Sequence, residues 1–496
     1  MKTSIQHLVL FMLVFPFPLV GQMCLPEGIH FTRQSQIDSF SIQYPGCTEI
    51  GGDVCIGNCL DFVDSDITNL DGLHSLTSIK GKLTISQNPV LTSLQGLQNL
   101  LVIEDDLLIS WNDILSSFEG LDQVRKMNGS FTLEWSTGID TLSGFDMLDT
   151  IAGTLTMTYL WDLTSITAFS NLKYLGGYKL FGLNQLKSIP DMNHLRYLGD
   201  FVLSFNGLTD LPEFPLLSTI NGDFHLNGNF KLPAMRGFEN INRVTGDFII
   251  EAAGEEIIRG TETFNLDAFH ALTDVDGSFR IHVERLDTLD GFTALDSVGG
   301  YFSISGSNGV HTFPQHNQFK FIGGSIYLNA LPMLQNLDCL NGLEHINGGL
   351  SLSSCPNLTS LSSISHFDEY IGGFSLSQMN LTNLSDLTNL KKIGGSLRIS
   401  YCNSLTNLGG LENLDSIDGH IYIVSNLNLE SLEGIQHIDP QTIYAESISA
   451  IYIQDNPRLM TCNVASICEA LRVLRRSYQI ENNALGCDHI SQIECK

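Results

Sequence analysis

Charged residues make up only 16% of this 496-residue sequence, and basic residues are the scarcer kind. Lys and Arg number 25 against 54 Asp and Glu, which gives a formal net charge of −29 at pH 7. Such an acidic chain repels nucleic-acid phosphates and anionic lipid headgroups, so we expect neither nucleic acid nor an anionic membrane as a partner. No segment after Val20 is long and apolar enough to span a bilayer, so we also expect no membrane insertion.

The sequence also lacks the short motifs of common catalytic and metal sites. It contains no GxSxG nucleophile elbow, no HExxH zinc motif, no GxxxxGK[ST] phosphate loop and no EF-hand spacing. Acidic residues occur at outward strand positions, but they do not gather in neighbouring repeats beside a basic partner. We therefore expect a protein that is not an enzyme and that binds no cofactor and no metal. A polysaccharide-active β-helix enzyme is the alternative.

The first 21 residues have the pattern of a signal peptide. Lys2 supplies the positive charge, and the apolar run from Leu8 to Val20 is too short to span a membrane. Cleavage after Gly21 would leave Gln22 at the new terminus. We therefore expect the mature protein to be secreted, extracellular or held at the cell surface.

A short phrase recurs through the sequence about every 24 residues. It consists of an aliphatic residue, any residue, glycine, any residue, and then two apolar residues separated by one, as in residues 79–85, 151–157 and 417–423. Apolar residues that alternate with polar ones predict a strand. A period of this length indicates stacked repeats, because one unit cannot bury its apolar face without neighbours.

The repeat units, here called rungs, can be counted from their first aliphatic residue. The rungs begin at Ile50, Ile79, Ile103, Met127, Ile151, Leu175, Leu198, Ile220, Val244, Val275, Val298, Ile322, Ile346, Ile371, Ile393 and Ile417, with a degenerate one near Ile451. Longer steps indicate loops near residues 251–264 and 438–447. At about 4.8 Å per rung, the stack is expected to form a rod of roughly 75–80 Å.

Position 9 after each start carries Asn or Cys in many rungs. These residues are Asn88, Asn112, Asn184, Asn229 and Asn426, together with Cys59, Cys355 and Cys402. A short, buried side chain that bonds the backbone of adjacent rungs explains the recurrence of Asn. Since a thiol fits the same slot, we expect Cys355 and Cys402 to be free and buried. Asn380 also falls at this position and is expected to be buried.

The eleven cysteines lie mainly at the ends of the array. Cys24, Cys47, Cys55 and Cys59 open it, Cys462, Cys468, Cys487 and Cys495 close it, and Cys339, Cys355 and Cys402 lie between. In a secreted chain this distribution predicts end caps stapled by disulfides. A zinc site is the alternative, but the sequence has no CxxC pair. Helix-compatible segments at residues 32–43 and 464–478 lie within the same two regions.

These patterns predict a mainly β fold, a single right-handed parallel β solenoid of about 16 rungs with disulfide-stapled helical caps. The expected division is a signal peptide at residues 1–21, an N-terminal cap at 22–49, the continuous solenoid at 50–460 and a C-terminal cap at 461–496.

The phrase Ile-x-Gly-x-Leu-x-Ile-x-x-Asn, followed by Leu-x-x-Leu-x-Gly-Leu-x-x-Leu, resembles the receptor L-domain branch of leucine-rich repeats. That branch includes the ligand-binding L domains of insulin- and EGF-type receptors. The opening residues 24–47 and the closing residues 462–468 are similar to the secreted bacterial members. The resemblance implies an L-domain-like, ligand-binding solenoid.

For the caps we expect three disulfides, Cys24–Cys47, Cys462–Cys487 and Cys468–Cys495. The latter two match the alternating connectivity of leucine-rich-repeat C-terminal caps. The pairing of Cys55 and Cys59 stays open. A direct bond between them would be awkward, because position 5 of a rung points outward and position 9 inward.

Three aromatic residues recur at position 8 of successive rungs. Trp111, Trp135 and Tyr159 stand 24 residues apart, with Trp161 close behind, at the solvent-facing edge of the expected strand surface. Exposed aromatics one rung apart suit stacking on sugar rings or anchoring a protein. The alternative is that they cover an apolar seam. A second set of outward positions carries His225, Arg280, His282, Tyr301, Tyr327, Arg398 and Tyr422.

The sequence therefore predicts a secreted or cell-surface repeat protein that presents an extended surface to an extracellular protein or carbohydrate ligand. Trp111, Trp135 and Tyr159 are the candidate ligand-binding residues. A purely structural surface protein, whose repeats bind only one another, is a further alternative besides the enzyme.

Overall fold

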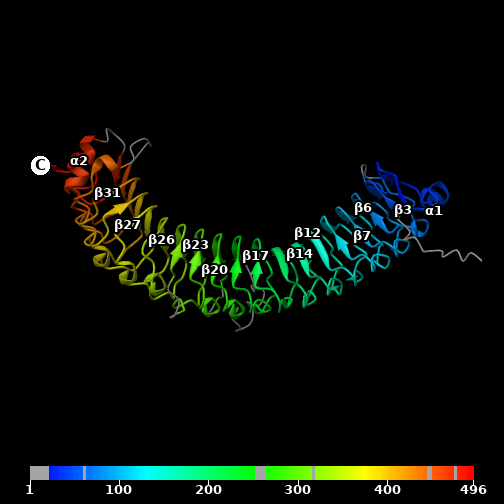
Figure 1. Cartoon of the computed structure of the whole chain (residues 1–496). Coiled ribbons are helices and arrows are strands. Elements are labelled where there is room, and N and C mark those ends of the chain that lie inside the picture. Colours follow the sequence, from blue (N-terminus) through cyan, green and yellow to red (C-terminus); the bar gives the residue numbers. More distant parts are fainter. Residues whose placement is uncertain are drawn as a thin grey trace, which may run out of the picture.

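The structure, a computed structural model, describes residues 22–59, 63–251, 264, 266–284, 286, 288–314, 319–443, 450–473 and 478–495. These residues form a mainly β, parallel solenoid of about 18 turns, which confirms the expected fold class. The solenoid curves into an arc with its two ends far apart along the stack (Figure 1). The expected signal peptide, residues 1–21, lies outside the described residues.

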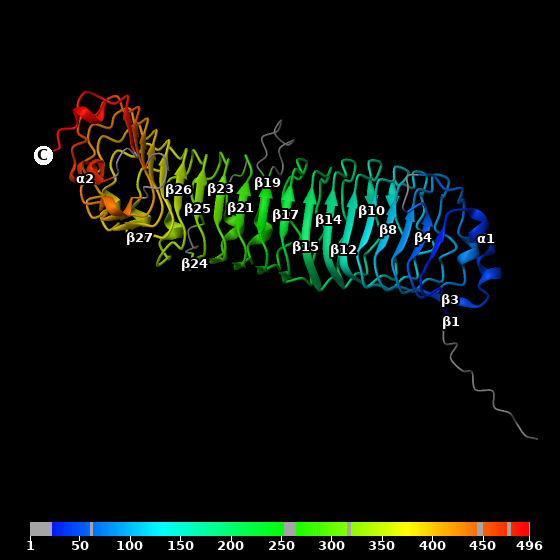
Figure 2. The same cartoon turned by 90° about the horizontal axis from the view of Figure 1, so that it is seen from above.

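One parallel sheet runs the length of the solenoid and lines the inner, concave side of the arc (Figure 2). Its main strands are β2 (Ile29–Phe31), β4 (Val54–Gly57), β6 (Leu83–Ser86), β8 (Leu107–Ser110), β10 (Phe131–Glu134), β12 (Thr150–Thr158), β14 (Tyr174–Phe181), β15 (Tyr197–Ser204), β17 (Phe224–Asn227), β19 (Phe248–Glu251), β21 (Phe279–His282), β23 (Phe302–Ser305), β25 (Ile326–Asn329), β26 (Leu350–Ser353), β28 (Phe374–Ser377), β30 (Leu397–Ser400), β32 (Ile421–Val424), β33 (Ile451–Gln454) and β34 (Tyr478–Glu481). Each pairs in parallel with the corresponding strand of the next rung.

Short strands precede the main strands and pair with one another in the same way. They are β1 (Gln22–Cys24), β3 (Cys47–Ile50), β5 (Ser78–Ile79), β7 (Val102–Ile103), β9 (Lys126–Met127), β16 (Thr219–Ile220), β18 (Arg243–Val244), β20 (Asp274–Val275), β22 (Ser297–Val298), β24 (Phe321–Ile322), β27 (Glu369–Tyr370), β29 (Lys392–Ile393) and β31 (Ser416–Ile417). In β12, β14 and β15 the two segments merge into one longer strand. A further pair, β11 (Thr141–Leu142) and β13 (Ser165–Ile166), lies elsewhere on the rung.

Positions 4 and 6 of each rung point inward, as their alternation predicts. Leu83 and Ile85 in β6, for example, are fully buried, and Thr84 between them is not. The leucines spaced three apart after the strand fill the rest of the interior. The core is therefore one continuous apolar column that each rung shares with its two neighbours.

Two rows of stacked phenylalanines, here called the phenylalanine spine, fill the middle of this core. The strand-side row is Phe201, Phe224, Phe248, Phe279 and Phe302, and the outer row includes Phe238, Phe269 and Phe292. Rings within a row stack nearly parallel, and rings of opposite rows meet edge to face. The repeat phrase alone does not predict these stacked phenylalanines.

The stack forms an arc rather than the expected rod (Figure 1). In the strand-side row the ring centroids of Phe224 and Phe248 are 4.8 Å apart, and those of Phe248 and Phe279 are 5.1 Å apart. In the outer row the spacings are 5.4 Å for Phe238–Phe269 and 5.6 Å for Phe269–Phe292. These rungs are therefore wider on their outer side than on the strand side, and stacked wedges of this kind produce an arc.

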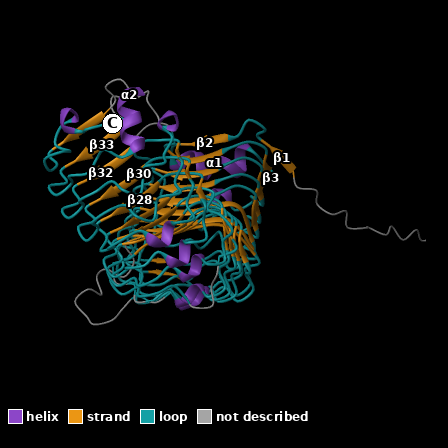
Figure 3. Cartoon of the chain, turned by 90° about the vertical axis from the view of Figure 1, so that its left-hand side faces the viewer, coloured by secondary structure: helices purple, strands orange, loops and turns teal. Residues whose placement is uncertain are grey.

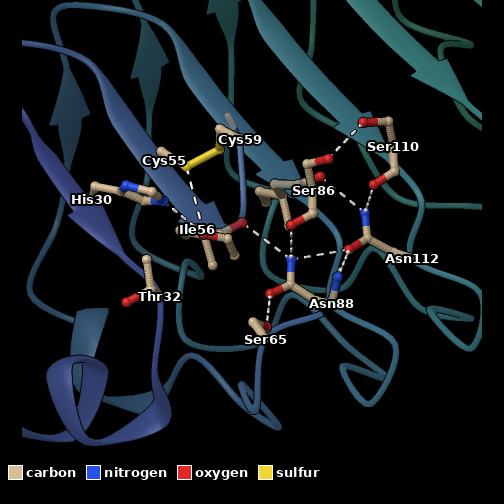
Figure 4. The surroundings of a disulfide bond; sticks show 12 residues. His30, Thr32, Cys55, Ile56, Cys59, Ser65, Ser86, Asn88, Ser110 and Asn112 are labelled. Carbon is tan, nitrogen blue, oxygen red and sulfur yellow. Dashed lines mark hydrogen bonds between the residues drawn. A yellow bond between two sulfur atoms is a disulfide. The ribbon is translucent and has the colours of Figure 1, made fainter. Parts of the chain in front are cut away.

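A ladder of buried asparagines ties neighbouring rungs together. Asn112 Nδ2 donates to the backbone oxygens of Ile85 and Ser110, both at 2.9 Å. Its Oδ1 accepts hydrogen bonds from the backbone N–H and the Nδ2 of Asn88, at 3.2 and 3.0 Å. Asn88 and Asn112 are fully buried, so these bonds satisfy polar groups that water does not reach (Figure 4).

At two of the expected ladder positions, the buried residue is the one before the predicted asparagine. Asn184 is exposed, and Leu183 occupies the buried slot, because the rung from Leu175 is one residue shorter before its strand. Asn380 is also exposed, with Met379 buried in its place.

Asn380 is not in the buried slot because its rung starts one residue earlier than predicted. Tyr370, and not Ile371, pairs with Ile346 and Ile393, and Ile371 is 53% exposed. The degenerate start near Ile451 is likewise shifted, since Ile451 pairs with Ile421 at position 4 of its rung.

The first ladder position is Ser65 and not Cys59. Ser65 Oγ donates to Asn88 Oδ1 at 2.6 Å, while Cys59 lies on the longer connection before it and is partly exposed (Figure 4). Because Cys59 does not occupy the inward slot, it can form a disulfide with Cys55. The expectation that a direct bond would be awkward was therefore wrong, because it assumed that both residues belonged to the regular rung.

The ends of the solenoid combine helices, disulfides and further strands. Helix α1 (Gln34–Gln43) and helix α2 (Ala465–Val473) lie at opposite ends (Figure 3). The disulfides Cys24–Cys47, Cys462–Cys487 and Cys468–Cys495 join the pairs that we expected.

The sheet nevertheless extends into both expected caps. Strand β1 pairs with β3 and β2 pairs with β4 at the N-terminal end, and β34 pairs with β33 at the C-terminal end. Tyr478, expected to end the second helix, instead begins β34, and residues 474–477 lie outside the described residues.

Three cysteines are free and buried, which confirms the expectation for Cys355 and Cys402 and adds Cys339. The thiols of Cys355 and Cys402 donate to backbone oxygens of the ladder positions, as Cys355 Sγ does to Ser353 O at 3.3 Å. Burial raises the pKa of both thiols to about 11. They are therefore protonated and unreactive at neutral pH.

The ladder predicts that Asn112→Leu loses about 1–3 kcal/mol of unfolding free energy, because buried backbone oxygens lose their donor. Asn184→Leu is the matched control and should change stability by less than about 0.5 kcal/mol, since Asn184 is exposed. Urea denaturation followed by circular dichroism measures both. Equal losses would show that the ladder does not distinguish the two positions.

The three free cysteines should not react with a thiol-specific chromogenic reagent at pH 8 in the folded protein, because they are buried and protonated. In guanidinium chloride, without a reductant, three thiols per chain should react. Fast labelling of the folded protein would contradict this arrangement.

Candidate functional site

The candidate binding residues share an unusual backbone conformation. Trp111, Trp135 and Tyr159 follow directly after their strands with φ angles of 56°, 48° and 55°. This left-handed region costs a residue with a Cβ about 1–2 kcal/mol. The equivalent positions of other rungs adopt the same conformation with glycine, as at Gly182, Gly228 and Gly306, or with other residues, as at Gln87 and Ser354. Large aromatic residues here are therefore not favoured by the local backbone.

The three side chains lie side by side across successive rungs. The rings of Trp111 and Trp135 are parallel within 1°, with centroids 5.2 Å apart, and Trp135 stacks on Tyr159 at 4.2 Å. Trp161 packs edge to face against Trp135 at 5.6 Å. The column continues through Phe181, which meets Tyr159 at 5.5 Å, and Phe205, which meets Phe181 at 5.7 Å.

These six residues form a surface that we call the aromatic strip: Trp111, Trp135, Tyr159, Trp161, Phe181 and Phe205. Trp111 is 40% exposed, Trp161 47%, and Phe181 and Phe205 are also exposed. Trp135 and Tyr159 are partly covered, mainly because each lies between two other rings. None of the six is buried. The sequence pattern identified four of them and missed Phe181 and Phe205.

The faces of the stacked rings are turned toward one another. The two sides of Trp135 are covered by Trp111 and Tyr159, so the solvent meets mainly ring edges along this part of the strip. Sequence spacing alone places the residues one rung apart but does not give the orientation of their rings.

Acidic residues adjoin the strip. Asp113 follows Trp111 by two residues, Glu134 precedes Trp135 and Asp162 follows Trp161. Asp113 and Asp162 are exposed, and Glu134 is partly exposed. No Lys, Arg or His within the described part of the chain forms an ion pair with these three carboxylates.

Several other acidic residues have structural partners. At position 3 of their rungs, Asp106, Asp223 and Asp247 each accept a hydrogen bond from a backbone N–H of the next rung, at 2.7–2.9 Å. Glu251 pairs with Arg280 at 2.8 Å. These four carboxylates therefore stabilise the stack.

One group near the N-terminal end has the composition of a metal site. The ligand atoms of His30, Cys55 and Cys59 lie within 4.8 Å of one another (Figure 4). Both sulfurs are joined in a disulfide and are not thiolates, so the group offers a metal only the imidazole. Moreover, His30 Nε2 lies 2.8 Å from Gly57 O.

The outward residues of the concave sheet are unevenly distributed. His225, Arg280 and His282 lie on its central strands, where Arg280 is already paired with Glu251. Tyr327, Arg398 and Tyr422 lie on β25, β30 and β32, nearer the C-terminal end. The predicted second set therefore does not form one continuous site.

Residues 371–472 match the model of the Receptor L domain family. This segment covers β28, β30, β32, β33 and most of α2. No curated protein sequence matches the chain. Within the part of the chain that the structure describes, no helix is both long and apolar enough to cross a bilayer.

The left-handed backbone gives a test of what the aromatic side chains contribute. Trp111→Gly should be more stable than Trp111→Ala by about 1 kcal/mol, since both remove the ring and only glycine relieves the positive φ. Thermal unfolding of the two variants measures the difference. The opposite order would show that the turn is not left-handed at this residue.

Proposed function

We propose that this chain is an extracellular, non-enzymatic ligand-binding solenoid and that the aromatic strip receives a protein partner. The Receptor L domain match supports a ligand-binding role. Four disulfides support an extracellular location, because such bonds persist in oxidising compartments.

The observation that carries the proposal is the exposed column of six aromatic side chains on consecutive rungs. Four of them, Trp111, Trp135, Tyr159 and Phe205, occupy left-handed backbone positions that disfavour a residue with a side chain. Aromatic residues are also the side chains that contribute most to protein interfaces.

The ring orientation favours a protein over a sugar at this strip. A sugar stacks its apolar face on the open face of an aromatic ring, but the faces in this column are largely turned toward each other. Apolar side chains of a protein can pack against ring edges instead. The sequence alone left these two ligand classes open.

The charge of the strip indicates the chemistry of the partner. Asp113, Glu134 and Asp162 adjoin the rings without an ion pair in the described structure, and the whole chain carries −29 charges. A partner segment with Arg or Lys beside apolar residues would meet both features, because a guanidinium binds a carboxylate and an aromatic ring together. Such a partner would also be attracted over long distances.

The alternative of a polysaccharide-active enzyme has less support. Four outward carboxylates, those of Asp106, Asp223, Asp247 and Glu251, instead bond with the backbone or with Arg280, as described above. Catalysis of glycoside hydrolysis needs two free carboxyl groups facing one another across the bond that is cleaved.

The protein carries its own reporter for this proposal. All three tryptophans of the sequence, Trp111, Trp135 and Trp161, belong to the strip. Titration with a peptide of alternating Arg and Leu should therefore change the tryptophan emission with saturation. A peptide of alternating Glu and Leu should not bind, and cellohexaose should not bind.

The double variant Trp111→Ala, Trp135→Ala should weaken binding of the basic peptide at least tenfold, measured by calorimetry. Tyr401→Ala is the matched control, since Tyr401 is an exposed aromatic at the same left-handed position of a distant rung. Saturable binding of cellohexaose, or unchanged peptide binding by the double variant, would refute the proposal.

A further inference from the structure

A second surface, on the concave sheet toward the C-terminal end, has a different chemistry. Tyr327 on β25 and Arg398 on β30 both point outward at position 5 of their rungs. The two strands between them carry Ser351 and Ser375 at the same position. Three strand steps separate Tyr327 from Arg398, a distance of about 14 Å. Two large side chains therefore stand on either side of short ones.

Arg398 is held in place without a carboxylate. Its guanidinium carbon lies 4.1 Å from the ring centroid of Tyr422, which in turn stacks on Tyr452 at 4.7 Å. No carboxylate of the described residues lies within 4.0 Å of it. Arg280, at the same position of an earlier rung, is instead paired with Glu251 at 2.8 Å. In a chain with a large excess of acids, an unpaired and oriented guanidinium favours an anion from outside.

The surface between Tyr327 and Arg398 offers free hydroxyl groups. The side chains of Ser351, Ser353 and Ser375 are partly exposed and make no hydrogen bond to another described residue. Tyr327 is 45% exposed and meets Tyr301 edge to face at 6.2 Å. No other aromatic ring of the described chain packs on it, so the side toward Ser351 has no ring over it.

We propose that this surface, here called the Arg398 site, binds an acidic saccharide. The carboxylate of a hexuronate unit would receive two parallel hydrogen bonds from the guanidinium of Arg398. The sugar hydroxyls would bond with Ser351, Ser353 and Ser375, and the apolar face of a neighbouring unit would stack on Tyr327. This combination fits an acidic sugar better than an acidic peptide, which has few hydroxyls to match the serines. The inference does not depend on the aromatic strip.

The test uses the mature chain and tetrasaccharides of galacturonate, of alginate and of hyaluronan, with calorimetry as the measurement. At least one should bind, and its methyl-esterified form should bind at least tenfold more weakly. Arg398→Gln should weaken binding about 10- to 100-fold, the scale of a charge-assisted pair. Tyr327→Ala should weaken it about tenfold. Thermal unfolding should show that both variants are folded.

Arg280→Gln is the matched control and should leave saccharide binding unchanged, since that guanidinium is already paired. The Trp111→Ala, Trp135→Ala variant should also bind the saccharide normally, which separates this proposal from that for the aromatic strip. The proposal is overturned if none of the three tetrasaccharides binds, if hexaglutamate binds as tightly, or if Arg398→Gln has no effect.

Discussion

Backbone pairing between successive rungs is the interaction on which the rest of this structure depends. The main strand of each described rung pairs with the main strands of neighbouring rungs and not with a strand of its own rung, so its N–H and C=O groups find their ladder partners in the neighbours. The asparagine ladder extends the same rule to the turn that follows the strand. Side chains of equivalent position are consequently brought into columns. Both candidate sites are such columns, one of stacked aromatics and one that places Tyr327, two serines and Arg398 in a row.

The regular part of the fold could be predicted from the sequence because it depends on a repeated apolar pattern. Inward residues such as Leu83 and Ile85, and ladder residues such as Asn112, follow directly from the period. The failures occur where the count loses the register. Asn184 lies in a rung shortened by one residue, Asn380 in a rung that starts at Tyr370 and not at Ile371, and Cys59 on a longer connection, so the buried slots are Leu183, Met379 and Ser65. Counting a fixed number of residues from the first aliphatic residue does not detect such changes.

For the candidate sites, the spacing of residues predicts position but not geometry. The spacing of Trp111, Trp135 and Tyr159 places them in one column, but it contains no information on ring planes or on the left-handed turn. The recurrence of glycine at the same position, as in Gly228 and Gly306, is the available sign of that turn. Phe181 was missed because it lies one position earlier in a shortened rung. Arg398 was noted as an outward residue, yet its lack of a carboxylate partner depends on neighbours from other rungs.

The phenylalanine spine has a consequence for how the chain folds. Strand partners in this solenoid lie only one rung apart in sequence, so no contact of the main sheet requires closing a long loop. A repeat array of this kind can begin to fold at any rung and propagate from there. The rungs from Phe201 to Phe302 bury two rows of interlocking rings, the largest apolar groups of the core. We expect order to arise first in this middle segment and to spread outward, so that the disulfides at the two ends close on rungs that are already formed.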